Sequence, residues 1–234
     1  EASEARQTAA AAEEKLREEL EVQRQRAEDA EKVIEEMRAG VSLPQMAQHA
    51  IEAGWNIDAV VNNDMIGNIT GVNGVVNNTT ARVFSEGTRY VETESEARQR
   101  RSQGGEVDSA SRNIARYVDE MADRYIPNLD IMMVYRLDRF GRGGHHRPFN
   151  EAGFPAVRIM ETNENYTQQH QDIRIENGVA YGDTIEHVNF AYAAKLTALL
   201  ASLGRFLGSL GPNFGHLALN LAFYMDFVIV WNQF

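Results

Sequence analysis

Short apolar runs separated by longer amphipathic segments restrict the folds that the middle of this chain can adopt. Four runs have the length and composition of buried strands, and they span residues 57–61, 81–84, 130–135 and 156–160. Three longer segments carry apolar residues on one helical face, and they span residues 45–53, about 109–125 and 184–203. Strands that alternate with helices predict an α/β domain in which helices cover a sheet.

Residues 1–39 form a charged segment that has no Gly or Pro and is rich in strong helix formers. Apolar and small side chains recur there in alternating steps of four and three, and Leu16, Leu20 and Ile34 are among the largest. The segment predicts a long helix that ends at Gly40. Three readings stay open: a solvated helix lying on the domain, a helix that pairs with a second copy of the chain, and a disordered segment.

The remaining segments carry signals for loops and helix ends. Residues 94–107 are polar and contain adjacent glycines, so we expect an exposed loop there. Beyond residue 203, several glycines and Pro212 predict that any helix is broken into short pieces, while residues 227–231 predict a closing strand. We therefore expect three parts: a charged helix at 1–39, an α/β domain at 40–203 and an apolar, Gly-rich tail at 204–234.

The composition argues against several classes of protein. Hydrophobic residues make up 43% and charged residues 24%, so a sizeable core can form. The formal net charge of −11 argues against a nucleic-acid partner, because such partners need a basic surface. The chain has no cysteine, so any metal must be bound by His, Asp and Glu. The longest apolar run, at 217–231, is shorter than the roughly 20 residues of a membrane-spanning helix and contains polar residues.

Two single residues are candidate metal ligands. Asp64 follows the first predicted strand, and the carboxyl ends of strands are where α/β sheets bind ligands. An Asp that caps a turn is the commoner reading of such a residue. His170 lies in a polar loop with Asp172 two residues later, and a carboxylate can orient an imidazole that binds a metal. An isolated surface histidine is the alternative.

Two residue pairs are further candidates. The glycine-rich turn at 141–149 holds His145 and His146, of which one can face a cleft and contact a substrate. Glu35 and Glu36 form a doublet, and in zinc peptidases one carboxylate serves as general base while another binds the metal. Glu-Glu doublets recur in this Ala/Glu-rich segment, so composition alone favours a solvated helix face.

Five motifs follow one another along the chain: Asn-Asn-Asp-Met-Ile-Gly-Asn at 62–68, Arg-Val-Phe-Ser-Glu-Gly at 82–87, Ser-Arg-Asn-Ile-Ala-Arg-Tyr at 111–117, Asp-Arg-Phe-Gly-Arg-Gly-Gly at 138–144 and Gln-His-Gln-Asp at 169–172. In this order they resemble the M28 family of zinc metallopeptidases, the aminopeptidase Y or leucyl-aminopeptidase-like group. The resemblance runs from about residue 54 to residue 203 and matches mainly the family's carboxy-terminal half. It implies a three-layer, zinc-exopeptidase-like (phosphorylase/hydrolase-like) fold, with a mixed sheet flanked by helices.

The resemblance also implies chemistry. Members of the family bind up to two zinc ions at the carboxyl ends of the sheet and remove N-terminal residues from peptides. By this resemblance Asp64 would bind one zinc and His170 the other. In many relatives a Glu-Glu pair precedes the Asp-Met-Ile-Gly segment at a similar distance, which implies Glu35 as general base and Glu36 as ligand. The resemblance implies an exported protein with a peptide substrate, although no signal peptide is visible at the start of this chain.

Two departures from the family pattern bear on activity. The family's His-x-Asp ligand motif and its bridging Asp segment, both expected before the Glu pair, are absent, because the first histidine is His49. The family's Gly-Gly-Asp-His turn reads Gly-Gly-His-His here, with His145 in place of the acid. Because zinc sites need at least three protein ligands, we expect an incomplete site. Three hypotheses remain: an active zinc aminopeptidase, an inactive domain of that fold that binds peptides or a partner, and an oligomeric module joined through its first helix.

The oligomeric hypothesis makes a direct prediction. If the seam of residues 1–39 joins two copies, the chain has a mass above the monomer, and polar replacements of Leu16, Leu20 and Ile34 lower that mass because they remove apolar contacts. Light scattering after size-exclusion chromatography measures it. A monomeric mass for the unaltered chain at every protein concentration would rule out pairing through this helix.

Overall fold

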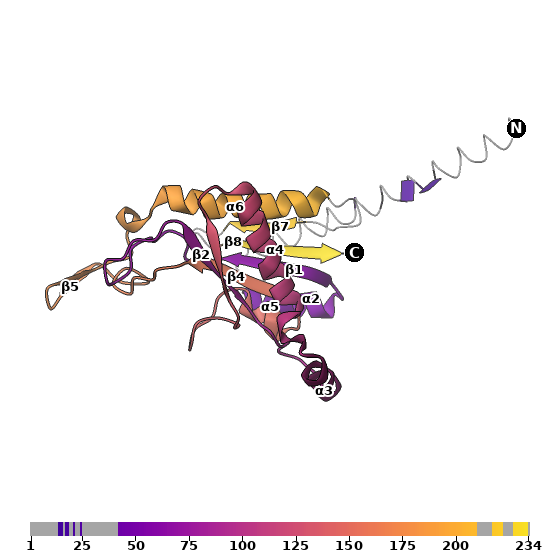
Figure 1. Ribbon diagram of the computed structural model, residues 1–234. Coiled ribbons are helices and arrows are strands. Elements are labelled where there is room, and N and C mark those ends of the chain that lie inside the picture. Colours follow the sequence, from indigo (N-terminus) through magenta and orange to yellow (C-terminus); the bar gives the residue numbers. More distant parts are fainter. Residues whose placement is uncertain are drawn as a thin grey trace, which may run out of the picture.

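A six-stranded mixed sheet forms the centre of the protein in its computed structural model (Figure 1). The structure describes residues 42–209, the strands at 217–221 and 227–233, and a few helical positions between residues 14 and 24. The strands are β1 (Asn56–Asn63), β2 (Thr80–Ser85), β3 (Asp130–Val134), β4 (Ala156–Glu161), β7 (Leu217–Leu221) and β8 (Phe227–Gln233). Their order is β3-β2-β4-β1-β8-β7. Strands β1 and β4 are parallel and so are β2 and β3, whereas β2–β4, β1–β8 and β7–β8 are antiparallel.

Helices cover both faces of this sheet. They are α2 (Leu43–Glu52), α4 (Ala110–Tyr125), α5 (Arg147–Glu151) and α6 (Phe190–Ser209). Val61 of β1 lies in one apolar cluster with residues of α4 and α6, while its neighbour Val60 lies in another with residues of α2 and α5. Successive side chains of a strand point to opposite faces, so these neighbours place the two helix pairs on opposite sides. The predicted α/β fold, a mixed sheet flanked by helices, is confirmed.

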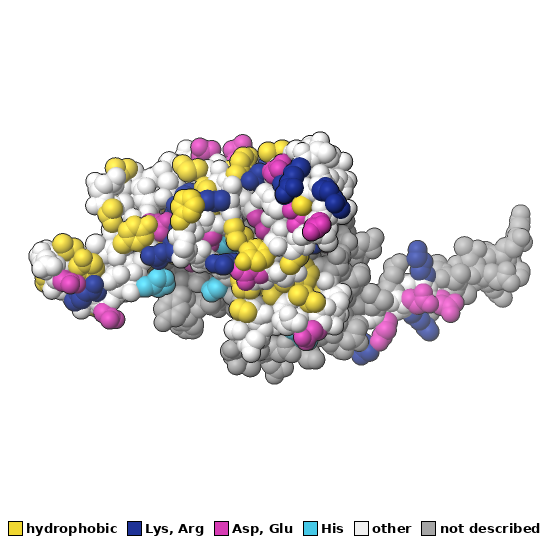
Figure 2. Space-filling view, turned by 90° about the horizontal axis from the view of Figure 1, so that it is seen from below, with side chains coloured by type: hydrophobic (Ala, Val, Ile, Leu, Met, Phe, Trp, Pro, Cys, Tyr) yellow, Lys and Arg dark blue, Asp and Glu magenta, His cyan; other side chains and the backbone are white. Residues whose placement is uncertain are grey.

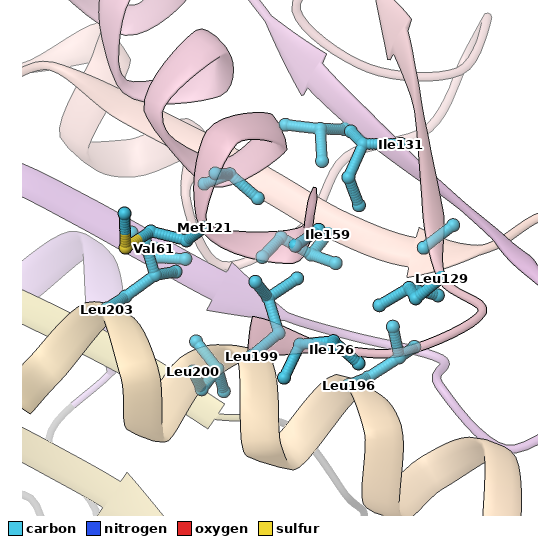
Figure 3. Close-up of a cluster of buried hydrophobic side chains, with 14 of the residues drawn as sticks. Val61, Met121, Ile126, Leu129, Ile131, Ile159, Leu196, Leu199, Leu200 and Leu203 are labelled. Carbon is cyan, nitrogen blue, oxygen red and sulfur yellow. The ribbon is translucent and has the colours of Figure 1, made fainter. Parts of the chain in front are cut away.

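The larger core lies between the sheet and helices α4 and α6 (Figure 3). Met121 of α4 and Leu196 and Leu199 of α6 are at most 1% exposed, and they meet Ile159 of β4. Helix α4 begins where the sequence predicts, because the Ser109 Oγ accepts a hydrogen bond from the backbone N–H of Arg112 at 3.2 Å. The apolar face of each helix is therefore what attaches it to the sheet.

The prediction of a loop at 94–107 is wrong. Helix α3 (Glu94–Gln103) and a short 3₁₀ helix at Gly105–Val107 fill this segment. Thr93 and Glu96 form a reciprocal capping box at the start of α3, and Gly104 ends it in the left-handed conformation with a φ of 67°. No residue of α3 is buried, so the helix lacks the regular spacing of apolar residues by which a helix is predicted from sequence. Only the residues that cap its two ends indicate that it is there.

The last long helix differs from its prediction at both ends. Residues 185–187 form a 3₁₀ turn, and α6 starts only at Phe190, where the Asn189 Oδ1 accepts from the N–H of Tyr192 at 2.8 Å. Contrary to expectation, α6 continues past Gly204 to Ser209. A helical glycine costs only about 1 kcal/mol, which does not stop a helix already packed along its length. Within the described residues, no helix is long and apolar enough to cross a membrane.

An arm that the sequence analysis missed projects from the body (Figure 1). It is a hairpin of β5 (Arg174–Glu176) and β6 (Val179–Tyr181). The turn residues Asn177 and Gly178 both have positive φ, at 52° and 80°, as the Asn-Gly pair of a tight hairpin requires. Figure 2 shows hydrophobic side chains on this arm, where Ile173 and Ile175 are 80% and 81% exposed.

The core predicts the effect of truncating α6. Leu199→Ala removes a fully buried side chain between α6 and the sheet, so we expect a loss of about 2–5 kcal/mol in the free energy of unfolding. Thr197→Ala, on the exposed side of the same helix, serves as the control. Urea unfolding followed by circular dichroism measures both. Equal stabilities of the two variants would contradict the packing of α6 onto the sheet.

Candidate functional site

The candidate site lies at the carboxyl end of β1, beside the parallel strand β4. The backbone N–H of Asp64 donates to the carbonyl of Ile159 at 3.1 Å, so the last ladder bond places Asp64 just beyond the strand end. Its side chain is 14% exposed. The Asn62 Oδ1 accepts from the backbone N–H of His145 at 3.0 Å and ties the loop at 136–146 to the same edge.

A buried arginine joins the parts of this site. Arg158 of β4 is 1% exposed, and its Nη2 lies 2.7 Å from the Oδ2 of Asp64. Its Nη1 donates to both carboxylate oxygens of Asp138, at 3.0 and 3.2 Å. The register of β1 and β4 sets Arg158 opposite Asn62, so strand pairing brings the guanidinium to both acids. Arg139 is a second cation at this cluster, since its Nε lies 3.3 Å from the Oδ1 of Asp138 while its Nη1 pairs with Glu164 at 2.6 Å.

Asp138 and His146 hold the loop against the strand ends. Burial alone would raise the pKa of Asp138, but Arg158, the backbone N–H of Arg139 and His146 hold this pKa below its usual value. His146 is completely buried, and its Nε2 lies 2.9 Å from the carbonyl of Leu137 and 3.6 Å from the Oδ2 of Asp138. Burial lowers the pKa of His146 to about 4. The imidazole is therefore neutral. Because the ring is enclosed by the protein, its role is to position the loop.

The charge of Asp64 acts on the imidazole of His145. Burial lowers the pKa of His145, Asp64 opposes this shift and Arg158 adds to it. The imidazole is neutral at physiological pH, which is the form that binds metals. Gly144 before it lies so close to the strand that a Cβ there would be 2.9 Å from the Oδ1 of Asn62 and from the Oδ2 of Asp64. The loop therefore packs directly onto the two polar side chains.

Glu161, at the end of β4, fixes the turn that follows Asp64. Its Oε2 accepts from the backbone N–H of Asn68 at 2.7 Å, and its own backbone N–H donates to the carbonyl of Met65 at 2.8 Å. Met65 has a φ of 63°, which is unusual for a residue with a side chain. The side chain of Glu161 is buried, and burial raises its pKa to about 8. The carboxyl group is thus held largely protonated at neutral pH, inside the turn that carries Asp64.

His170 lies apart from this cluster in the interactions that it makes. It is exposed, has a φ of 51°, and its backbone N–H donates to the Oδ2 of Asp183 at 3.1 Å. No hydrogen bond or ion pair joins His170 to Asp64 within the described part of the chain. The predicted pair of ligands therefore remains a prediction.

The described residues do not supply a complete metal site. Among residues 42–209, no group of three or more His, Asp or Glu side chains lies close enough together to hold a metal ion. The predicted general base Glu35 and ligand Glu36 lie outside the described residues. Asp64 and His145 make at most two donors, whereas zinc sites use at least three protein ligands.

Sequence reasoning identified Asp64, His145 and His146 but missed the residues that hold them. Arg158 and Glu161 stand at the third and last positions of an otherwise apolar strand, where a charged residue needs a partner. That signal was readable in the sequence. The partner Asp138 was not, because it is 20 residues away and reaches Arg158 only through the fold.

Comparison with known proteins gives relatives of one kind. None of the protein-family models matches the chain. Three curated relatives are named probable zinc metalloprotease. Those of Leptosphaeria maculans and Pyrenophora teres f. teres are 44% and 43% identical over 60% and 64% of this chain, and that of Pyrenophora tritici-repentis is 38% identical over 67%. The matches cover 33%, 32% and 36% of these relatives, so the chain spans about a third of their length.

One solved structure resembles the fold in part. The Legionella pneumophila LapA aminopeptidase aligns with 68% of this chain and 34% of its own, with a TM-score of 0.42 and 19% sequence identity.

The burial of Glu161 predicts a pH dependence of stability. The pKa of this carboxyl group is about 8 in the folded protein and about 4.5 when unfolded, so the folded state binds its proton more tightly. Its contribution is complete below about pH 4.5 and is lost as the pH rises through 8, by at most about 1.4 kcal/mol per pH unit. In Glu161→Gln this dependence disappears. Urea unfolding between about pH 5 and pH 8 measures it.

The control for this experiment is Glu176→Gln, which changes an exposed carboxylate on the hairpin arm. We expect its stability to follow the unaltered protein at each pH. A Glu161→Gln variant whose stability also runs parallel to the unaltered protein would show that Glu161 is ionised in the folded state.

Proposed function

We propose that this chain is part of a zinc metallopeptidase of the aminopeptidase type, related to the M28 family, and that Asp64 is one of its metal ligands. The names of the curated relatives support the metallopeptidase class. The place of Asp64 at the carboxyl end of a central parallel strand supports its role, because open α/β sheets bind their ligands there. Peptides are the proposed substrates.

The observation that carries the proposal is the arrangement of the Asp64 carboxylate. Its Oδ2 is held by Arg158 at 2.7 Å, while no described residue donates a hydrogen bond to Oδ1. The side chain is also the most exposed of the three that form the buried ion pairs, at 14% against 1% for Arg158 and 2% for Asp138. One oxygen is thus fixed by Arg158, the other accepts no hydrogen bond from a described residue, and the carboxylate interacts electrostatically with His145. A carboxylate oxygen and a neutral imidazole are both donors that zinc accepts.

The two donors alone do not fit a zinc ion, because a third protein ligand is needed. Under this proposal the remaining ligands come from outside the cluster around Asp64. Glu36 is one candidate, with Glu35 as the general base, and His170 is the other candidate from the sequence.

A second function is favoured by one observation. Arg158 pairs with Asp64 at 2.7 Å, so the carboxylate has a cationic partner in the fold without a metal ion. A domain that keeps the scaffold and binds peptides or a partner without hydrolysing them needs no more than this. The two functions differ in metal content and in turnover, which makes them separable by experiment.

The peptidase proposal predicts a metal that depends on Asp64. The purified chain should carry near-stoichiometric zinc and release an aminoacyl reporter, and a chelator should abolish that release. Asp64→Asn keeps the size of the side chain but loses the charge that binds a cation, so zinc content and turnover should both fall at least tenfold, or about 1.4 kcal/mol. Elemental analysis and a fluorogenic assay measure the two quantities.

The control is Asp123→Asn, an exposed carboxylate on α4 that should change neither zinc content nor turnover. Thermal unfolding checks that Asp64→Asn is folded. His170→Ala and Glu36→Gln, measured in the same way, tell which of these two residues completes the ligand set. A folded, unaltered chain that holds no zinc and shows no turnover would overturn the peptidase proposal for this chain and leave the binding domain.

A further inference from the structure

A cavity lies at the opposite end of the same strands. It has a volume of about 520 Å³, within the range of small-molecule sites. Its walls come from the start of β1, the segment after β2, the first turn of α4 and the residues before β4. Asp58 in this wall is six residues before Asp64 on an extended strand, so the cavity is about 20 Å from the candidate site. The two places do not share residues.

Two carboxylates face this cavity without enough positive charge beside them. Glu86 is only 7% exposed, and its Oε1 accepts from the Asn150 Nδ2 at 3.1 Å, whereas no described residue donates to Oε2. The Oδ2 of Asp58 is buried and has no hydrogen-bond partner among the described residues. A buried carboxylate oxygen without a donor is costly, so the wall favours a ligand that supplies donors and positive charge.

The cation at the rim does not meet this need. Arg89 is exposed, and its guanidinium is shared between the Oε1 of Glu96 at 3.3 Å and the carbonyl of Gly153 at 3.4 Å. The first turn of α4, which would attract an anion, is occupied by its own cap, since the Ser109 Oγ accepts from the N–H of Arg112. One guanidinium against two carboxylates leaves an excess of negative charge. An anionic ligand is therefore disfavoured.

The remaining wall is apolar, and this decides between a metal ion and an organic cation. Ile57, Phe154 and Pro155 line the cavity beside the acids. No group of three His, Asp or Glu side chains that could hold a metal exists among the described residues, so the two acids fall short of a metal site. An ammonium group with a short carbon chain satisfies both parts of the wall. Its N–H donors reach the acids, and its chain lies on the apolar residues.

We propose that this cavity is a binding site for a primary organic ammonium ion, whose nitrogen lies between Glu86 and Asp58. The apolar part of the ligand packs against Ile57, Phe154 and Pro155. The site is separate from the proposed metal site and does not depend on peptidase activity. An alkylamine or the side chain of a lysine has the required chemistry.

A titration of the purified chain with n-pentylammonium chloride tests this proposal. Amide resonances of residues 57–58, 86–89 and 109–111 should shift together and saturate in ¹H–¹⁵N spectra, while those around Asp64 stay in place. Glu86→Gln keeps an oxygen for Asn150 but removes the charge, so binding should weaken at least about tenfold, as expected for a lost charge-assisted hydrogen bond. Asp58→Asn should also weaken binding, and it replaces Glu86→Gln as the test variant if Glu86→Gln fails to fold.

Matched ligands and a matched variant complete the test. Glu94→Gln removes an exposed carboxylate from α3 and should leave the affinity unchanged. 1-Pentanol, which is neutral, and hexanoate, which is anionic, should bind far more weakly than n-pentylammonium. The proposal is overturned if pentanol or hexanoate binds as tightly as the amine, if Zn²⁺ or Ca²⁺ shifts the same resonances, or if both acid-to-amide variants keep the full affinity.

Discussion

The buried guanidinium of Arg158 is the interaction on which the carboxyl end of the sheet depends. Burying a charge in a protein interior costs several kcal/mol unless charged partners surround it. Arg158 meets that condition through Asp64, which follows β1, and Asp138, which lies in the loop after β3. One side chain of β4 therefore joins three segments that are distant in sequence. If it were lost, Asp64 would lose its ion-pair partner, while Asp138 would keep Arg139 and His146 beside it.

The two ends of the central strands differ in how their charges are balanced. At the carboxyl end, two carboxylates enclose one buried guanidinium, and neutral histidines fill the space around them. At the amino end, no buried cation among the described residues pairs with Glu86 or Asp58, and burial raises the pKa of Glu86 to about 7. The same parallel strands thus carry a largely compensated cluster at one end and an uncompensated one at the other. This difference is why we assign the two ends different ligands.

The sequence predicts the framework better than it predicts the site. The strands β1 to β4 and helix α4 follow from local features, namely apolar runs and one apolar helix face, and each is found within two residues of its predicted place. Helix α3 was missed because it is polar on every side, although Thr93, Glu96 and Gly104 mark its ends. Asp64 was recognisable from its position after a strand. Its connection to Arg158 was not, because it depends on the register of β1 and β4, which no local pattern fixes.

Gly144 determines how the loop that it belongs to can vary. A Cβ at this position would lie 2.9 Å from the Asn62 Oδ1 and from the Asp64 Oδ2, so a larger residue would displace the two polar groups on which the loop is seated. Among related chains, a change of chemistry at this edge can arise by exchanging residue 145 while the backbone stays unchanged. The glycine thus holds the loop against the strand ends while the residue next to it can be exchanged.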